Sequence, residues 1–115
     1  MRRFVLPLLV LALLSPLPAL PAAGPLGANR VTVTMTDYKF RLSKATVQRG
    51  TVVFTVVNSG EVVHDFKIAG RKTPIYEAGM SGSLKVAFTK PGRYPFLCTV
   101  PGHALAGMKG VLKVT

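Results

Sequence analysis

The sequence predicts an all-β fold, an antiparallel sandwich of seven short strands in one domain. Hydrophobic and polar side chains alternate from residue 30 to the C-terminus, Val and Thr are frequent, and no long stretch has a helical period. The inward-facing sets are expected to be Val31, Val33 and Met35; Tyr38, Phe40 and Leu42; Val52, Phe54 and Val56; Val62, His64, Phe66 and Ile68; Leu84, Val86 and Phe88; Tyr94, Phe96 and Cys98; and Leu112 and Val114.

Turn-forming residues separate these stretches along the chain. They are Arg49-Gly50, Asn58-Ser59-Gly60, Ala69-Gly70, Ser81-Gly82 and Pro91-Gly92. In the fourth stretch Asp65 and Lys67 are expected to face away from the core, because they alternate with the inward residues. Residues 70–82 are the least patterned and predict the longest loop, with room for a helical turn. Pro95 cannot donate to a ladder, so it predicts an edge, a bulge or an irregular pairing.

Residues 1–28 have the features of a signal peptide. Arg2 and Arg3 precede an apolar run, residues 4–14, and a stretch of prolines and small residues follows it. Cleavage is expected between residues 22 and 28, which leaves a mature domain at 29–115. The alternative is an uncleaved membrane anchor, but the apolar run is shorter than the roughly 20 residues of a spanning helix. We therefore expect an exported protein, periplasmic or otherwise extracytoplasmic, which is membrane-anchored only if the leader remains.

The predicted mature domain is strongly basic. It contains thirteen Lys and Arg residues against four Asp and Glu residues, a formal net charge of +9. Such a charge favours acidic partners or brief contact with an anionic membrane, or simply keeps the surface solvated. Nucleic acid is not an expected partner, because an exported chain rarely meets it and no recognition helix or aromatic-basic pattern occurs.

The chemistry-bearing residues gather near the C-terminus. The segment Cys98-Thr-Val-Pro-Gly-His103-Ala-Leu-Ala-Gly-Met108 places four residues between each pair of potential ligands, and His64 is the only other histidine. Two imidazoles, one thiolate and a weak thioether are the ligand set of a blue-copper electron-transfer site. A lone cysteine in an oxidising compartment has no intrachain disulfide partner, which is consistent with a metal ligand.

These residues predict one type 1 copper ion, alternating between Cu(I) and Cu(II), bound by His64, Cys98, His103 and Met108. A dinuclear copper-thiolate centre would need a second cysteine, and a separate catalytic copper would need more histidines, so we do not expect an enzyme. Zinc also accepts cysteine and histidine, but its structural sites have four firm ligands. Asp65 and Thr99, which each follow a ligand, are expected either to join the two ligand segments by a hydrogen bond or to be exposed polar residues.

The segment from Gly92 to Gly110 resembles the copper-loop region of the cupredoxin family. Its Tyr94-Pro-Phe96-Leu-Cys98 is similar to the strand that leads into the copper loop, and Pro101-Gly102-His103 is similar to azurin and auracyanin. Ala106-Gly107-Met108 is similar to plastocyanin and pseudoazurin. Val63-His64-Asp65-Phe66 resembles the first-histidine strand, although many members have Asn at the position of Asp65. The resemblance implies a seven- or eight-stranded Greek-key β-sandwich with one type 1 copper.

The family resemblance also implies a route for electrons through His103 at the solvent edge. Redox partners, acidic at their docking surface, would contact an apolar patch formed by Pro101, Ala104, Leu105 and Ala106, and a small patch suits brief encounters. We expect a monomer, and we do not expect the carbonyl of Val63 to approach the copper as it does in azurin. Two alternatives stay open: copper transfer or buffering with the same ligands, and an interaction module with a structural metal site.

Overall fold

The computed structural model describes residues 12–15 and 29–115. Most of the predicted signal peptide, including its expected cleavage region, lies outside the described residues. Within the described part of the chain, no helix is long and apolar enough to cross a membrane.

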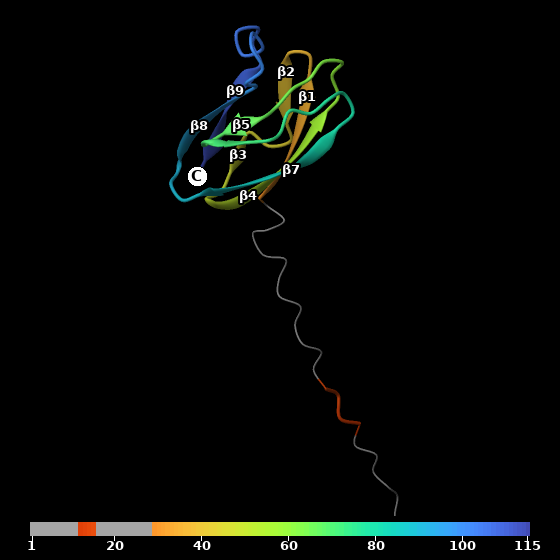
Figure 1. The fold of residues 1–115 in the computed structure, drawn as a ribbon. Coiled ribbons are helices and arrows are strands. Elements are labelled where there is room, and N and C mark those ends of the chain that lie inside the picture. The colour runs from red at the N-terminus through yellow and green to blue at the C-terminus, as the bar shows by residue number, and fades with distance from the viewer. Residues whose placement is uncertain (1–11, 16–28) are drawn as a thin grey trace, which may run out of the picture.

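The described residues form a β-sandwich, which confirms the predicted fold class (Figure 1). One sheet has four strands in the order β2-β1-β4-β7, and the other has five in the order β3-β9-β8-β5-β6. The strands are β1 (Arg30–Thr36), β2 (Lys39–Leu42), β3 (Thr46–Val47), β4 (Gly50–Asn58), β5 (Lys67–Ile68), β6 (Arg71–Lys72), β7 (Ser81–Phe88), β8 (Gly92–Leu97) and β9 (Lys109–Val114). The loop between β8 and β9 projects from one end of the sandwich (Figure 1).

Both sheets are mixed, whereas the sequence predicted antiparallel pairing throughout. Strand β1 runs parallel to β4, and β3 runs parallel to β9; the other strand pairs are antiparallel. The physical reason is the path of the chain. After the β1–β2 hairpin the chain crosses to the second sheet as β3 and returns as β4 on the other side of β1, and such a crossover allows parallel neighbours.

The inner faces of the two sheets bury a hydrophobic core, as the alternation predicts. It consists of Val31, Val33, Met35, Val47, Val52, Phe54, Val56, Phe66, Ile68, Tyr76, Leu84, Val86, Phe88, Phe96, Cys98, Met108, Leu112 and Val114. Tyr38 and Val62 were predicted to face inward, but they are 41% and 38% exposed. Neither lies in a strand: Tyr38 is in the β1–β2 turn and Val62 is in the loop after β4, so the period of two does not orient them.

The segment around His64 departs most from its predicted form. The expected long strand is reduced to β5, and His64 forms only an isolated bridge with Tyr76, donating to its carbonyl at 3.1 Å and accepting from its N–H at 2.8 Å. His64, Asp65 and Phe66 are all fully buried. The outward orientation predicted for Asp65 is therefore wrong. Asp65 does not lie in a strand, so the period of two does not orient its side chain.

Pro95 lies inside β8, opposite Val111 of β9. On its other side β8 pairs with β5 only through Phe96 and Leu97. At Pro95 the strand therefore has one neighbour, which agrees with the predicted edge position. Residues 70–82 contain β6 and the start of β7, and residues 73–80 between them are a loop without a helical turn.

Candidate metal centre

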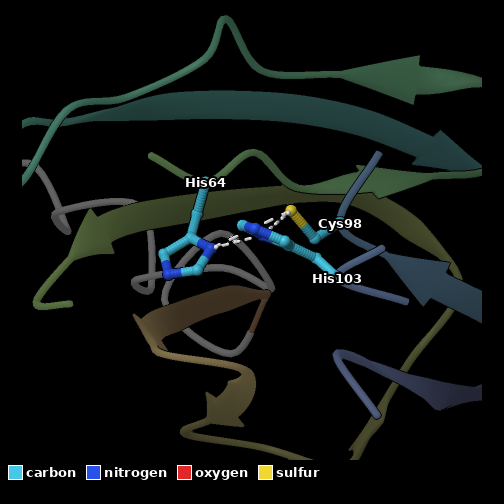
Figure 2. Close-up of side chains that lie close together, drawn as sticks. All are labelled: His64, Cys98 and His103. Atoms are coloured by element: carbon cyan, nitrogen blue, oxygen red, sulfur yellow. Dashed lines mark hydrogen bonds between the residues drawn. The ribbon is translucent and has the colours of Figure 1, made fainter. Parts of the chain in front are cut away.

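Two chain segments supply the candidate ligands at one end of the sandwich. His64 lies in the loop before β5, Cys98 directly follows β8, and His103 lies in the loop between β8 and β9. The side chains of His64 and Cys98 are buried, and His103 is half-buried. Figure 2 shows the two imidazole rings and the thiol meeting at one point.

The distances among the three side chains are short. Nδ1 of His64 lies 3.1 Å from Nδ1 of His103. Sγ of Cys98 lies 3.5 Å from Nδ1 of His103 and 4.0 Å from Nδ1 of His64. The same nitrogen of each ring, Nδ1, therefore faces the sulfur (Figure 2).

This spacing fits a single metal ion. Metal–nitrogen bonds of about 2.0 Å and metal–sulfur bonds of about 2.3 Å set the donors of one ion about 3 to 4 Å apart. The three donor atoms here lie within 4.8 Å of one another. A thiolate with two imidazoles is a soft to borderline donor set, which favours copper over Mg²⁺, Ca²⁺ or Mn²⁺.

Met108, the fourth predicted ligand, ends the same loop. It is fully buried, and its carbonyl accepts a hydrogen bond from the N–H of Cys98 at 3.1 Å. The backbone of Met108 is thus held beside the cysteine, in the interior of the sandwich.

The loop that carries His103 is held by its own backbone hydrogen bonds. The N–H of His103 donates to the carbonyl of Val100 at 3.1 Å, and the N–H of Met108 donates to the carbonyl of His103 at 3.1 Å. Gly102 and Gly107 have φ values of +84° and +107°, a region where glycine is favoured. These tight turns bring His103 back over Cys98.

The predicted link between the ligand segments is present. The backbone N–H of Thr99 donates to Oδ1 of Asp65 at 2.6 Å, and its hydroxyl donates to Oδ2. Asp65 is fully buried, and the ammonium group of Lys72 lies 4.0 Å from Oδ2. The alternative that Asp65 is an exposed polar residue is wrong.

Two residues of the β1–β2 turn also contact the site, and the sequence had not indicated them. Oδ1 of Asp37 lies 2.8 Å from Nε2 of His64. The ring of Tyr38 meets the ring of His103 edge-on at a centroid distance of 4.9 Å. The only signal for Asp37 in the sequence is that it is one of four acidic residues in a basic chain.

The protein environment shifts three pKa values at the site. Burial raises the pKa of the Cys98 thiol, and burial followed by repulsion from His64 lowers the pKa of His103. Hydrogen bonds from the backbone N–H of Glu61 and from His64 lower the pKa of Asp37. Without metal, the centre therefore favours a neutral thiol, a neutral His103 and an ionised Asp37 at neutral pH.

Comparison with curated proteins relates this chain to copper proteins. It is 54% identical over 43 residues to Auracyanin-B of Chloroflexus aurantiacus, covering 37% of this chain and 18% of that protein. It is 35% identical over 107 residues to the Copper-resistant cuproprotein CopI of Rubrivivax gelatinosus, covering 73% of this chain and 65% of that protein. The chain thus spans less than two thirds of the length of either relative.

Solved structures share the fold. An auracyanin from Roseiflexus castenholzii, reduced with dithionite, superposes with a TM-score of 0.66 at 24% identity, over 76% of this chain and 97% of that one. A structure of Auracyanin B gives a TM-score of 0.63 at 25% identity, over 75% and 88% of the two chains. The sequence model of the cupredoxin-like domain family matches residues 5–114 of this chain. The chain is a member of the cupredoxin family.

Proposed function

We propose that this protein carries single electrons through one type 1 copper ion held by His64, Cys98, His103 and Met108. The observation that carries the proposal is the convergence of two Nδ1 atoms and one thiol sulfur within 4.8 Å. A bound copper ion would supply a one-electron couple between Cu(I) and Cu(II). The surrounding residues determine how firmly the ligands are held.

His64 and Cys98 are each held by several contacts. The backbone of His64 is bridged to Tyr76, and its Nε2 contacts Asp37. The backbone of Cys98 is bonded to Met108, and the next residue, Thr99, is bonded to Asp65. Ligands held in this way move little when the charge on the metal changes, which favours rapid electron exchange. The Met108 thioether and the polarity around the sulfur would tune the potential.

His103 is the route we propose for electrons. It is the one half-buried residue among three converging side chains, whereas His64 and Cys98 are buried. The patch of Pro101, Ala104, Leu105 and Ala106 lies on the same loop, and the Leu105 side chain is 95% exposed. An apolar patch of this kind supports short-lived contact with a redox protein. The positive charge of the domain favours partners with acidic docking surfaces.

The remaining parts of the proposal concern location and reaction class. The predicted signal peptide supports export to the periplasm or another extracytoplasmic space. The chain has one cysteine and two histidines, and the proposed site uses all three. No histidine or cysteine is left for a second copper centre, so we propose a carrier and not an enzyme.

Copper transfer or buffering is the second candidate function. The similarity to a protein named Copper-resistant cuproprotein CopI favours it, and the same four ligands would serve. The two functions differ in whether the metal leaves the protein. A carrier keeps its copper through many redox cycles, whereas a transfer protein gives it up to a competing ligand.

Protein-film voltammetry of the copper-loaded protein, with a Cu(I) chelator in solution, distinguishes them. An electron carrier gives a reversible wave whose amplitude persists over repeated cycles. Loss of the wave as the chelator takes up copper would support transfer or buffering instead. The ratio of copper to protein on the electrode, measured before and after cycling, distinguishes loss of copper from loss of protein.

A further inference from the structure

We propose that Asp37 is a positioning residue for His64: it accepts a hydrogen bond from Nε2 and so keeps Nδ1 free as the metal-binding atom. The inference rests on the proposed copper site. Oδ1 of Asp37 lies 2.8 Å from Nε2, on the side of the ring opposite to Cys98. Asp37 lies in the turn between β1 and β2, a part of the chain that supplies no proposed ligand.

The chemistry of the two groups fixes the direction of this hydrogen bond. An ionised carboxylate can only accept, so the proton lies on Nε2 of His64. A neutral imidazole has one proton, and Nδ1 then presents a lone pair. That lone pair faces Nδ1 of His103 at 3.1 Å and Sγ of Cys98 at 4.0 Å. The carboxylate thus selects the tautomer that can bind metal at the converging point.

The loop after β4 holds the Asp37 carboxylate in place. The N–H of Glu61 donates to Oδ2 at 3.0 Å, and the N–H of Val62 donates to Oδ1 at 3.3 Å. Because both amides belong to the loop that leads into His64, the carboxylate and the imidazole share one support. The loop backbone therefore orients the carboxylate toward the ring.

The loop backbone at Gly60 packs closely against the side chains of Asp37 and His64. A Cβ at Gly60 would lie 2.4 Å from Oδ1 of Asp37 and 3.0 Å from Nε2 of His64. The N–H of Gly60 donates to Oδ1 of buried Asn58 at 2.9 Å, and Nδ2 of Asn58 donates to the carbonyl of Val62 at 2.9 Å. Only glycine leaves room here for the carboxylate to reach the ring.

The tautomer of His64 can be read in the metal-free protein by ¹⁵N NMR of its imidazole. We expect one tautomer in the unsubstituted protein, protonated at Nε2 and bare at Nδ1. Asp37→Leu should give a mixture of tautomers and bind Cu(I) 10- to 100-fold more weakly in competition with a chelator, the usual effect of losing such a partner. Asp37→Asn keeps an acceptor oxygen but adds an N–H donor, so it should also give a mixture of tautomers, with a smaller loss of affinity than Asp37→Leu.

Glu61→Gln is the matched control. It removes the same charge from the adjacent loop, where only the backbone N–H of Glu61 contacts Asp37. We expect it to leave both the tautomer and the affinity unchanged. An equal loss of affinity in Glu61→Gln and Asp37→Leu would assign the effect to general charge and overturn the inference.

Two further results would overturn it. One is a His64 protonated at Nδ1 in the unsubstituted metal-free protein, a measurement that needs no variant. The other is an Asp37→Leu protein that keeps the single tautomer and binds Cu(I) within twofold of the original. Neither result depends on the visible spectrum. If the proposed copper site itself is wrong, the unsubstituted protein stays colourless with Cu(II) bound, and that outcome is recognised separately.

Discussion

Thr99 donates two hydrogen bonds to the buried carboxylate of Asp65, one from its backbone N–H at 2.6 Å and one from its hydroxyl. Asp65 directly follows His64, and Thr99 directly follows Cys98. The pair therefore joins the two segments that carry the buried ligands. It is a direct mechanical connection between otherwise distant parts of the chain.

Loss of this connection should destabilise the metal-free protein. Asp65→Ala leaves the Thr99 N–H without its partner, and we expect the free energy of unfolding to fall by about 1–3 kcal/mol. Asp65→Asn keeps an acceptor oxygen and gains an N–H donor. We expect it to lower the free energy of unfolding less than Asp65→Ala does. Urea unfolding measures both. Glu77→Ala, at an exposed position, is the control and should stay within about 0.5 kcal/mol. Equal losses in all three variants would contradict the assigned role.

The thioether of Met108 is expected to set the reduction potential. Met108→Leu preserves volume in the core and should cost less than about 1.5 kcal/mol of stability. It removes an electron donor that stabilises Cu(II) more than Cu(I), so the potential should rise while the colour remains. Met35→Leu makes the same change at another fully buried methionine and should leave the potential unchanged. If Met108→Leu leaves the potential of the unsubstituted protein unchanged, as Met35→Leu should, Met108 is not a copper ligand.

The apolar patch around His103 is tested without knowledge of the partner. Electron self-exchange between reduced and oxidised copies, measured by NMR line broadening, depends on the surface through which they meet. Leu105→Lys places one more positive charge on that surface in both copies. It should slow the exchange about tenfold, equivalent to about 1.4 kcal/mol. The visible spectrum should not change.

Val111→Lys provides the comparison for this surface. Val111 is 43% exposed and lies on β9, outside the patch of Pro101, Ala104, Leu105 and Ala106. The added charge is the same, so the general repulsion between copies is the same. If the two variants slow self-exchange equally, the patch has no special role in docking.

Copper binding should release a proton. Burial raises the pKa of the Cys98 thiol, so in the metal-free protein it is protonated at pH 7, whereas the lowered pKa of His103 keeps that imidazole neutral. A metal binds the thiolate, so its affinity should rise about tenfold per pH unit between pH 7 and 8. Calorimetry in two buffers of different ionisation enthalpy counts the released protons. Binding of Cu(I) without proton release would show that the thiol is already ionised.

The sequence predicted the candidate site well because the chain has only one cysteine and two histidines. The only cysteine and both histidines were predicted to meet, and the structure brings their side chains together. The alternation of Val and Thr predicted the two packed faces of β1 and β4, because a period of two fixes which side chains share a face. It did not specify the direction of neighbouring strands, so the parallel pairing of β1 with β4 was missed.

Tertiary contacts explain the other differences. The segment around His64 forms only a bridge to Tyr76, and Asp65 is buried. Local alternation predicts neither of these contacts. Asp37 reaches Nε2 of His64 only because the β1–β2 turn folds over the ligand end of the sandwich. No spacing rule connects residues 27 positions apart in the chain.

The most direct test of the account is the visible absorption and paramagnetic resonance of the Cu(II)-loaded protein. Ligation by the Cys98 thiolate with His64 and His103 predicts an intense thiolate-to-copper band and a narrow copper hyperfine splitting. A protein that binds Cu(II) yet stays colourless, with the wide splitting of an ordinary nitrogen and oxygen site, would contradict the proposed centre.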